Sequence, residues 1–497
     1  MRQSNRAPSI LRKDLEKLRN SKILSLAIKS KINLNNEDLE RISSLENLNL
    51  VIDAIYEADK SISLRKEIFL DELLNNIRLI NKVLSIMPNA IIFDCDGTLV
   101  QTEVINKLTF KEILKPNKEK LTPEEIQDIY QNQVLYSIEN IEENKEIHEI
   151  FEEVFQQEIQ NNKQEYEINP YNVISQVLID EENQIIEEKK VLFVALLLSS
   201  LIKGLTFNTA FNTILTPRIP GQFRDIQDFR QIFRSHNKEI KETLGVESTL
   251  GTKEFLEENQ TPYMVASNSP NFVIQENTQE LNIPEEKILS SHDLDKKRGK
   301  PHPDVFLLAL KKLQSNPRQT IIIEDSKPGV LAALSAGICL TFTNQIVTKL
   351  NSFTQSMQFS EKQKIENKIM EIITDEIYID KINETLERHM FGYIYILGQE
   401  CIETGIAKAY QNLLKSQILE ELVDAINEII IDSTPEIESR LLTKDTLEMF
   451  LNYITENTVK DLPQIIIFNN GDNQALCSHQ SFFSISDMQD LNFLLNQ

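Results

Sequence analysis

The chain has 497 residues, of which 52 are basic and 76 acidic, so its net charge at pH 7 is −24. This sign disfavours nucleic acid and anionic membrane surfaces as main partners, because both attract basic proteins. The four cysteines, at positions 95, 339, 401 and 477, form no CxxC pair, which argues against a disulfide framework or a zinc site and favours a cytoplasmic location.

Residues 1–88 are predicted to be helical and to carry no site residue. In Glu67–Met87, apolar residues recur near the helical period through a charged background. No apolar segment near the N-terminus has the form of a secretory signal. The longest apolar run, Val191–Ile202, is shorter than the roughly 20 residues that a membrane span needs. We therefore expect an N-terminal helical extension and no membrane-spanning segment.

Short apolar runs begin at residue 89 and predict a parallel sheet. They are Ala90–Phe93, Tyr263–Ala266, Thr320–Ile323 and Ile338–Phe342. Each of the first three is followed by polar residues, and helical patterns lie between them. This alternation is typical of parallel strands joined by crossover helices, with a site at the carboxyl ends of the strands. The sequence thus predicts an α/β fold with a Rossmann-like sheet.

Residues 104–245 separate the first predicted strand from the second and contain mostly helical patterns. A parallel crossover needs only about a dozen residues, so these roughly 140 residues predict an inserted helical domain. Its last part contains four arginines, at positions 218, 224, 230 and 234. They can meet an anionic substrate, or they can pair with the surrounding acidic residues on a solvated helix.

Residues 348–497 are predicted to be mostly helical again, since Glu361–Ile382 and Gln417–Ile431 are charged and amphipathic. Gln464–Phe468 is a strand candidate, and the Asn470-Gly471 pair that follows is a hairpin signal. This segment resembles the first strand and its loop, but asparagine replaces the acidic residue. We interpret it as a terminal strand and hairpin.

Two carboxylates stand directly after the first predicted strand, in Asp94-Cys95-Asp96-Gly97. A carboxylate in such a turn can attack phosphorus and form an acyl phosphate. A second carboxylate two residues later can protonate the leaving oxygen and then deprotonate water. Asp-Gly is also common in plain turns, so this motif by itself leaves both interpretations open.

Polar residues after the other predicted strands supply the remaining parts of a phosphate site. Ser267 and Asn268 follow the second strand and can donate hydrogen bonds to phosphate oxygens. Lys300 stands in a turn flanked by prolines and can offset negative charge. Glu324 and Asp325 follow the third strand and can bind Mg²⁺, which prefers oxygen ligands.

Four segments, FDCDGTLVQTE, VASNSP, GKPHPDVF and IIIEDSKPGVLAALSAGI, occur in this order and resemble the four motifs of the haloacid dehalogenase superfamily. The resemblance is to the branch that includes β-phosphoglucomutase-like and phosphoglycolate-phosphatase-like enzymes, and it covers about residues 89–347. It implies a division of the chain into a catalytic core at 89–103 and 246–347, a helical cap at 104–245, and helical regions at 1–88 and 348–497.

The resemblance also implies a role for each site residue. Asp94 would be the nucleophile and Asp96 the general acid and base. Ser267 and Lys300, with Asn268 beside them, would bind the transferring phosphoryl group. The resemblance further implies a Mg²⁺ ion, held by Asp94, by the backbone carbonyl of Asp96 and by Asp325, with Glu324 in support.

Asp96 favours a phosphate ester as the substrate. Relatives that cleave carbon–halogen bonds lack an acid at this position, because a halide needs no proton, and phosphonate-cleaving relatives lack it too and use a cap lysine. One departure from the family pattern is Gln101, where relatives often have aspartate. It lies at the expected cap hinge, so it leaves the chemistry in place and puts the substrate in doubt.

Three functions are compatible with these observations. The first, which we expect, is a Mg²⁺-dependent phosphatase of a small phosphorylated metabolite such as a sugar phosphate. The second is a phosphomutase with the same catalytic residues, and the third is an interaction protein whose helical flanks bind a partner or a second copy. Because the four motifs are complete without the flanks, we expect a fragment of about residues 86–350 to retain the chemistry. We also expect the flanking helices to pack on each other.

Overall fold

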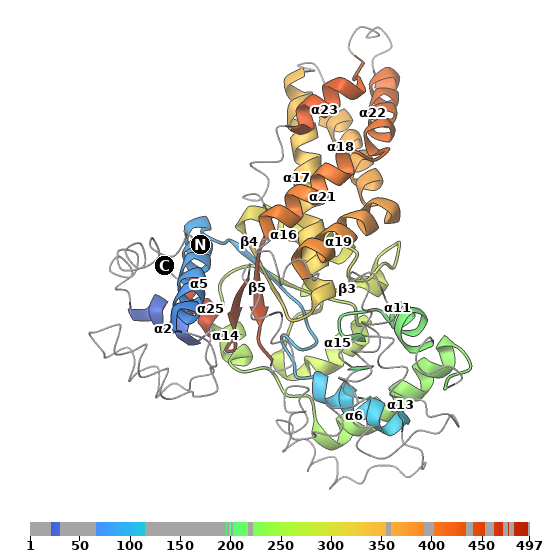
Figure 1. The fold of residues 1–497 in the computed structure, drawn as a ribbon. Coiled ribbons are helices and arrows are strands. Elements are labelled where there is room, and N and C mark those ends of the chain that lie inside the picture. The colour runs from blue at the N-terminus through green and yellow to red at the C-terminus, as the bar shows by residue number, and fades with distance from the viewer. Residues whose placement is uncertain are drawn as a thin grey trace, which may run out of the picture.

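A computed structural model describes residues 21–29, 66–114, 195, 198–199, 202–216, 222–353, 359–391, 402–433, 441–452, 462–470, 476 and 482–495. Within these residues a six-stranded sheet of order β3-β2-β1-β4-β5-β6 lies at the centre, and every neighbouring pair is parallel (Figure 1). The strands are β1 (Ala90–Phe93), β2 (Tyr263–Ser267), β3 (Ile288–Ser290), β4 (Thr320–Glu324), β5 (Gln464–Phe468) and β6 (Phe483–Ile485). The predicted Rossmann-like α/β fold is confirmed.

Both faces of this sheet are covered, which explains its unbroken apolar strands. Every residue of β1, β2, β4 and β5 is buried. Successive residues of a strand point to opposite faces. Accordingly Ile92 and Ile322 belong to one hydrophobic cluster, while Ile91 and Ile321 belong to another. Parallel strands buried on both faces give short continuous apolar runs, so the first three predicted strands are confirmed.

The predicted strand at Ile338–Phe342 is wrong, because these residues lie inside α17 (Lys327–Phe353). A short apolar run fits a buried helix as well as a buried strand, and the place beside β4 is taken by β5. Within α17, Lys327–Leu350 is the one described stretch of helix long and apolar enough to cross a membrane. However, 78% of its most apolar window is buried inside the protein, as in a core helix.

The two C-terminal strands belong to the central sheet, although the sequence analysis places their region, 348–497, outside the core. β5 pairs with β4 from Ile321 and Gln464 to Glu324 and Ile467. β6 runs parallel to β5, so the predicted hairpin is wrong, since hairpin strands are antiparallel. The Asn-Gly signal describes only the local turn. The pairing of β5 depends instead on the burial of both its faces within the sheet.

Different sets of helices cover the two faces of the sheet (Figure 1). On one face lie α16 (Asp304–Leu313) and α17, and the same hydrophobic cluster continues into α18 (Phe359–Ile373), α19 (Glu376–Phe391), α21 (Ile402–Leu414), α22 (Ile418–Ser433) and α23 (Lys444–Asn452). Of these, α18 and α23 pack along α17, α22 packs on α18 and α23, and all three project beyond the sheet (Figure 1). The other face carries α2 (Ser21–Lys29), α5 (Lys66–Ile86), α14 (Thr252–Glu258), α15 (Asn271–Asn277) and α25 (Asp490–Leu495).

The helices of 1–88 share a cluster with α25, and α5 packs against it, so the expectation that flanking helices pack on each other is confirmed for this pair. The helices of 348–460 bury their side chains in the other cluster, so the described flanks do not form one helical unit.

The described part of the predicted cap is helical. It consists of α6 (Glu103–Leu114), α11 (Phe207–Thr209), the π-helix η3 (Ala210–Leu215) and α13 (Ile226–Leu244). α6 packs along α13, and Phe110, Phe229 and Phe233 belong to a separate hydrophobic cluster. The bounds 104–245 stay a prediction, because residues 115–194 lie outside the described residues. Short 3₁₀ helices in the core are η4 (Gln279–Leu281), η5 (Glu285–Lys287), η6 (Ser291–Asp293) and η7 (Pro317–Gln319).

Candidate active site

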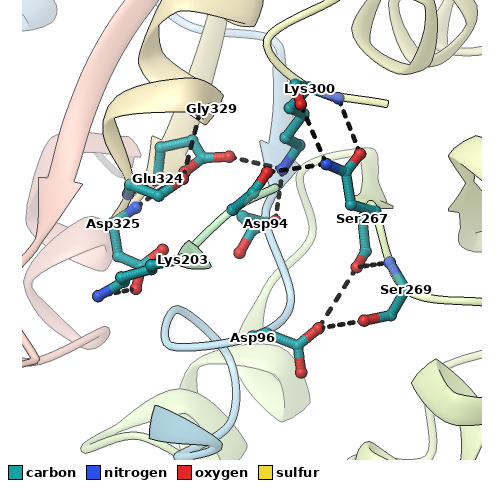
Figure 2. A network of polar contacts seen from close by, with 12 residues as sticks. Asp94, Asp96, Lys203, Ser267, Ser269, Lys300, Glu324, Asp325 and Gly329 are labelled. Carbon is teal, nitrogen blue, oxygen red and sulfur yellow. Dashed lines mark hydrogen bonds and ion pairs between the residues drawn. The ribbon is translucent and has the colours of Figure 1, made fainter. Parts of the chain in front are cut away.

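The carboxyl ends of β1, β2 and β4 bring the predicted site residues together (Figure 2). These strands are neighbours in the sheet and run parallel, so their ends meet at one edge. Asp94 follows β1, Ser267 ends β2, and Glu324 ends β4. Lys300 reaches the same place from the loop before α16. The four sequence motifs are thus assembled at the edge where the sequence analysis expects a site.

Lys300 lies between two carboxylates. Its ammonium donates hydrogen bonds to Asp94 Oδ1 and to Glu324 Oε1, the second at 2.5 Å. The side chains of Lys300 and Glu324 are 1% and 0% exposed. Burial raises the pKa of Asp94 well above its ordinary value, and Lys300 opposes this rise. Burial alone would lower the pKa of Lys300, but Asp94 and Glu324 outweigh it and raise that pKa. Lys300 is therefore a fixed positive charge beside Asp94.

Glu324 uses both carboxylate oxygens inside the protein. Besides the bond from Lys300, its Oε2 accepts hydrogen bonds from Asp325 N at 3.0 Å, Ser326 N at 3.1 Å and Ser326 Oγ at 3.0 Å. Gly329 lies so close that a Cβ there would overlap the carboxylate. These contacts make Glu324 the residue that holds Lys300 and the loop after β4, which agrees with a supporting place in a metal site.

Asp94, Glu324 and Asp325 form an acidic cluster that fits a divalent cation. One carboxylate oxygen from each lies within 4.8 Å of the others, and all three residues are buried. Carboxylate oxygens are the hard donors that Mg²⁺ prefers. Burial raises the pKa of Asp325 to about 6, with Lys203 opposing the rise and Glu324 adding to it. The donor set present thus suits the ion that the resemblance implies.

Two residues that the sequence analysis does not assign to the site contact Asp325. Lys203 Nζ, from the cap, lies 2.7 Å from Asp325 Oδ2 and 3.8 Å from Glu103 Oε1. Asn470, directly after β5, donates to the same Asp325 oxygen at 2.7 Å and to Gly97 O at 3.0 Å. The one signal for Asn470 is the resemblance of its segment to the first strand and loop.

Gly97 is required by both its conformation and its surroundings. Its φ of +85° is unfavourable for residues with a side chain. A Cβ would overlap the carboxylate of Asp325 and lie 2.9 Å from Asn470 Nδ2. The loop after β1 can therefore approach the loops after β4 and β5 only because this position is glycine.

Asp96 occupies a separate place in the site, facing Ser269 (Figure 2). Its Oδ2 accepts hydrogen bonds from Ser269 Oγ at 2.7 Å and Ser267 Oγ at 3.5 Å. Its Oδ1 accepts one from Asn277 Nδ2 at 3.1 Å, and Lys241 of the cap donates to Asn277 Oδ1 at 2.7 Å. Asp96 is thus positioned by neutral donors, apart from the ion pairs of Lys300.

Asn268 connects three parts of the site. Its Oδ1 accepts a hydrogen bond from Lys300 N at 2.8 Å, and its Nδ2 donates to Gly204 O at 2.8 Å and to Lys300 O at 3.3 Å. These bonds join the loop after β2 to the Lys300 loop and to the cap. Ser267, Asn268 and Lys300 therefore line one wall, and their binding of phosphate stays a prediction.

A cavity of about 450 Å³ opens beside Asp94 and Asp96, between the core and the cap. This volume lies in the usual range for small-molecule sites. Arg234 lines the cavity, whereas Arg224 pairs with Asp228 at 2.7 Å and Arg230 donates to Asn208 at 2.8 Å. Pairing with an acidic residue is thus confirmed for Arg224, contact with an anionic substrate stays a prediction for Arg234, and Arg218 lies outside the described residues.

Comparison with known proteins gives matches to a protein family and to individual proteins. A family model for haloacid dehalogenase-like hydrolases matches residues 88–337, half of the chain. The chain is 33% identical over 99 residues to a phosphorylated carbohydrates phosphatase of Thermotoga maritima. The aligned segment makes up 20% of this chain and 44% of that protein. The chain is also 48% identical over 50 residues to a bifunctional riboflavin kinase/FMN phosphatase of Arabidopsis thaliana. This aligned segment makes up 10% of this chain and 13% of that protein.

Among solved structures, the chain is similar to a β-phosphoglucomutase from Clostridium difficile, with a TM-score of 0.30 and 18% identity over 50% of this chain and 82% of that one. These values are too low to support an argument about function. The chain also spans less than half the length of the two curated relatives above. The activities in their names are therefore stated of those two proteins and not of this chain.

Proposed function

The chain belongs to the haloacid dehalogenase-like hydrolase family, and we propose that it is a Mg²⁺-dependent phosphatase of a small phosphorylated metabolite. The observation that carries this proposal is the pairing of Asp94 with the buried Lys300 while Asp96 lines the same cavity. A nucleophile, a fixed cation and a second carboxylate are what phosphate-ester cleavage through an acyl phosphate requires. A sugar phosphate-type ester is the substrate that the sequence leads us to expect.

In the proposed reaction, a carboxylate oxygen of Asp94 attacks phosphorus, and the bond from phosphorus to the ester oxygen breaks. Asp96, in its protonated form, gives its proton to that leaving oxygen. Asp96 then takes a proton from a water molecule, which attacks the aspartyl phosphate and releases phosphate. Lys300 stabilises the negative charge at phosphorus, and Ser267 and the loop after β2 hold the phosphate oxygens.

Mg²⁺ would be held by Asp94, the backbone carbonyl of Asp96 and Asp325, with Glu324 in support. When bound, the ion would offset the negative charge that the phosphate shares with these carboxylates. The charges of the cluster support this placement, since Asp94 and Glu324 share the ammonium group of Lys300 and Asp325 pairs with Lys203, and a divalent cation would add positive charge among these buried carboxylates.

The remaining parts of the proposal concern location and partners. We propose a cytoplasmic protein without nucleic-acid or membrane partners, on the basis of its net charge of −24 and its scattered cysteines. Cys95 and Cys339 are both buried free thiols, as a reducing compartment allows. We also propose α18–α23 as a surface for a protein partner or a second copy, supported by the exposed Ile377 and Ile431 on α19 and α22.

A screen of phosphate esters with the purified full-length chain tests this function. We expect at least one ester to release inorganic phosphate with Mg²⁺, to stop doing so with EDTA, and to recover when Mg²⁺ is added in excess. Absence of phosphate release from the whole panel would contradict a phosphatase. Isomerisation of a sugar phosphate in the presence of a bisphosphate primer, without net phosphate release, would favour the phosphomutase alternative.

Asp96→Asn is expected to lower kcat by about 10² to 10⁴, the usual contribution of a positioned acid and base. The loss should be smaller for p-nitrophenyl phosphate than for an alkyl phosphate, because a good leaving group needs little protonation. Steady-state kinetics with the two esters measures this difference. Asp295→Asn, the same change at an exposed position of the core, is the control and should leave both rates unchanged. An equal loss for both esters in Asp96→Asn would contradict the assigned role.

A further inference from the structure

The cavity contains aromatic side chains from both the core and the cap. Phe207 of α11 and Phe272 of α15 line it, and Phe272 is 60% exposed, which is unusual for so large an apolar side chain. Arg234 of α13 lies between them, with its guanidinium carbon 6.0 Å from the centroid of each ring. We call these three residues the Phe–Arg–Phe group. It offers flat apolar surfaces and one planar cation.

The packing of the cap fixes the position of Phe207. Its ring centroid lies 5.4 Å from those of Phe229 and Phe233, which are both buried, and its plane is at 81° to Phe233. Edge-to-face contacts of this kind restrict how a ring can turn. Phe207 is therefore backed by the cap's hydrophobic cluster while it lines the cavity, so its remaining surface is a fixed wall.

The part of the cavity wall that the Phe–Arg–Phe group forms is a poor match for a polyol, so it argues against the sugar phosphate-type ester that the sequence leads us to expect. Each sugar hydroxyl that leaves water needs a hydrogen-bond partner, and phenylalanine rings supply none. A flat aromatic ring, in contrast, gains from burial, from contacts with other rings and from a guanidinium group beside it. The cavity of about 450 Å³ has room for such a group beyond the phosphate.

We propose that the substrate is a phosphate monoester whose alcohol carries an aromatic or heteroaromatic ring, and that this ring binds against Phe207, Arg234 and Phe272. The inference rests on the proposed phosphatase function and names its substrate class. The phosphate lies at Asp94 and Lys300, and the ring lies at the Phe–Arg–Phe group, with the bond to be cleaved between them beside Asp96.

Binding to the full-length Asp94→Asn variant, which is expected not to turn over, tests this substrate class. Calorimetric titration with Mg²⁺ present compares 2-naphthyl phosphate with glycerol 3-phosphate and glucose 6-phosphate. We expect the naphthyl ester to bind at least about tenfold more tightly than either of the others. Equal affinities, or a preference for the polyol esters, would overturn the inference.

Two further substitutions in the Asp94→Asn background locate the ring. Phe272→Ala and Arg234→Gln should each weaken binding of the naphthyl ester by about five- to tenfold and leave glycerol 3-phosphate unchanged. Phe272 is exposed, so its removal leaves the fold intact. The controls are Leu250→Ala, at an apolar residue that is 63% exposed elsewhere, and Arg224→Gln, at an exposed cap arginine paired with Asp228. Equal weakening of both esters by Phe272→Ala would contradict the placement of the ring.

Phosphate release by the wild-type protein from the same esters separates this inference from the proposed function. Tight naphthyl binding without any phosphate release would contradict the phosphatase and support the aromatic ligand class. Phosphate release from the polyol esters alone would support the phosphatase and overturn the aromatic ligand class.

Discussion

Replacing Asp94 by asparagine is expected to abolish turnover, with kcat lowered at least about 10⁴-fold, as for loss of a catalytic nucleophile in other enzymes. The amide cannot form an acyl phosphate. Its oxygen can still accept the hydrogen bond that Lys300 now donates to Asp94 Oδ1, so the site should keep its shape. Single-turnover and steady-state rates with the best ester of the panel measure the effect.

Two controls show whether the loss of activity in Asp94→Asn comes from the missing nucleophile or from a change in the fold. The circular dichroism spectrum of Asp94→Asn should match that of the wild-type protein, and the exposed Asp295→Asn should retain full activity. Activity of Asp94→Asn within tenfold of the wild type would rule out an aspartyl phosphate at this residue.

A fragment of residues 86–350 is expected to be inactive, and this replaces the expectation from the sequence. Truncation removes β5, so β4 loses a parallel partner along its length and becomes a free edge. It also uncovers α17, which packs against α18, α19 and α23 in the full chain. Finally, it removes Asn470 and its hydrogen bond to Asp325. Expression of this fragment beside the full chain, with solubility and phosphate release as readouts, tests the result. A soluble fragment with full activity would contradict it.

Asn470→Ala in the full chain tests how much the hydrogen bond to Asp325 contributes to activity without removing β5 from the sheet. Loss of a hydrogen bond to a charged group typically costs about 1.5–3 kcal/mol, so we expect kcat to fall about 10- to 100-fold and the Mg²⁺ requirement to rise. Asn492→Ala is the matched control, because Asn492 bonds the exposed Glu258 far from the site. Unchanged kcat and Mg²⁺ dependence in Asn470→Ala would show that the contact has no role in the chemistry.

The sequence predicts the catalytic edge of the sheet well because its signals there are local. β1, β2 and β4 are apolar runs that end in polar residues, and parallel strands bring such ends together. Asp94, Lys300, Glu324 and Asp325 are accordingly found in contact. Their catalytic roles stay proposals, since the arrangement shows proximity and charge.

The same local signals cannot show which distant segments complete the site. Ile338–Phe342 has the composition of a strand, yet it lies in a helix because β5 takes the place beside β4. Lys203 and Asn470 meet at Asp325 only once the cap and β5 are placed in space. Ser269 and Asn277 likewise reach Asp96 through the fold. None of these contacts has a spacing in the chain that predicts it.

Trapping of the phosphoryl group tests the central claim most directly. The wild-type full-length chain is mixed with Mg²⁺ and an aryl phosphate with a good leaving group, and acid is added during the first turnover. Peptide mass spectrometry then locates the covalent phosphate. We predict one phosphoryl group on the peptide that contains Asp94, and its absence in Asp94→Asn. Phosphate on a different residue, or release of the aryl alcohol without any phosphorylated peptide at any time, would contradict the account.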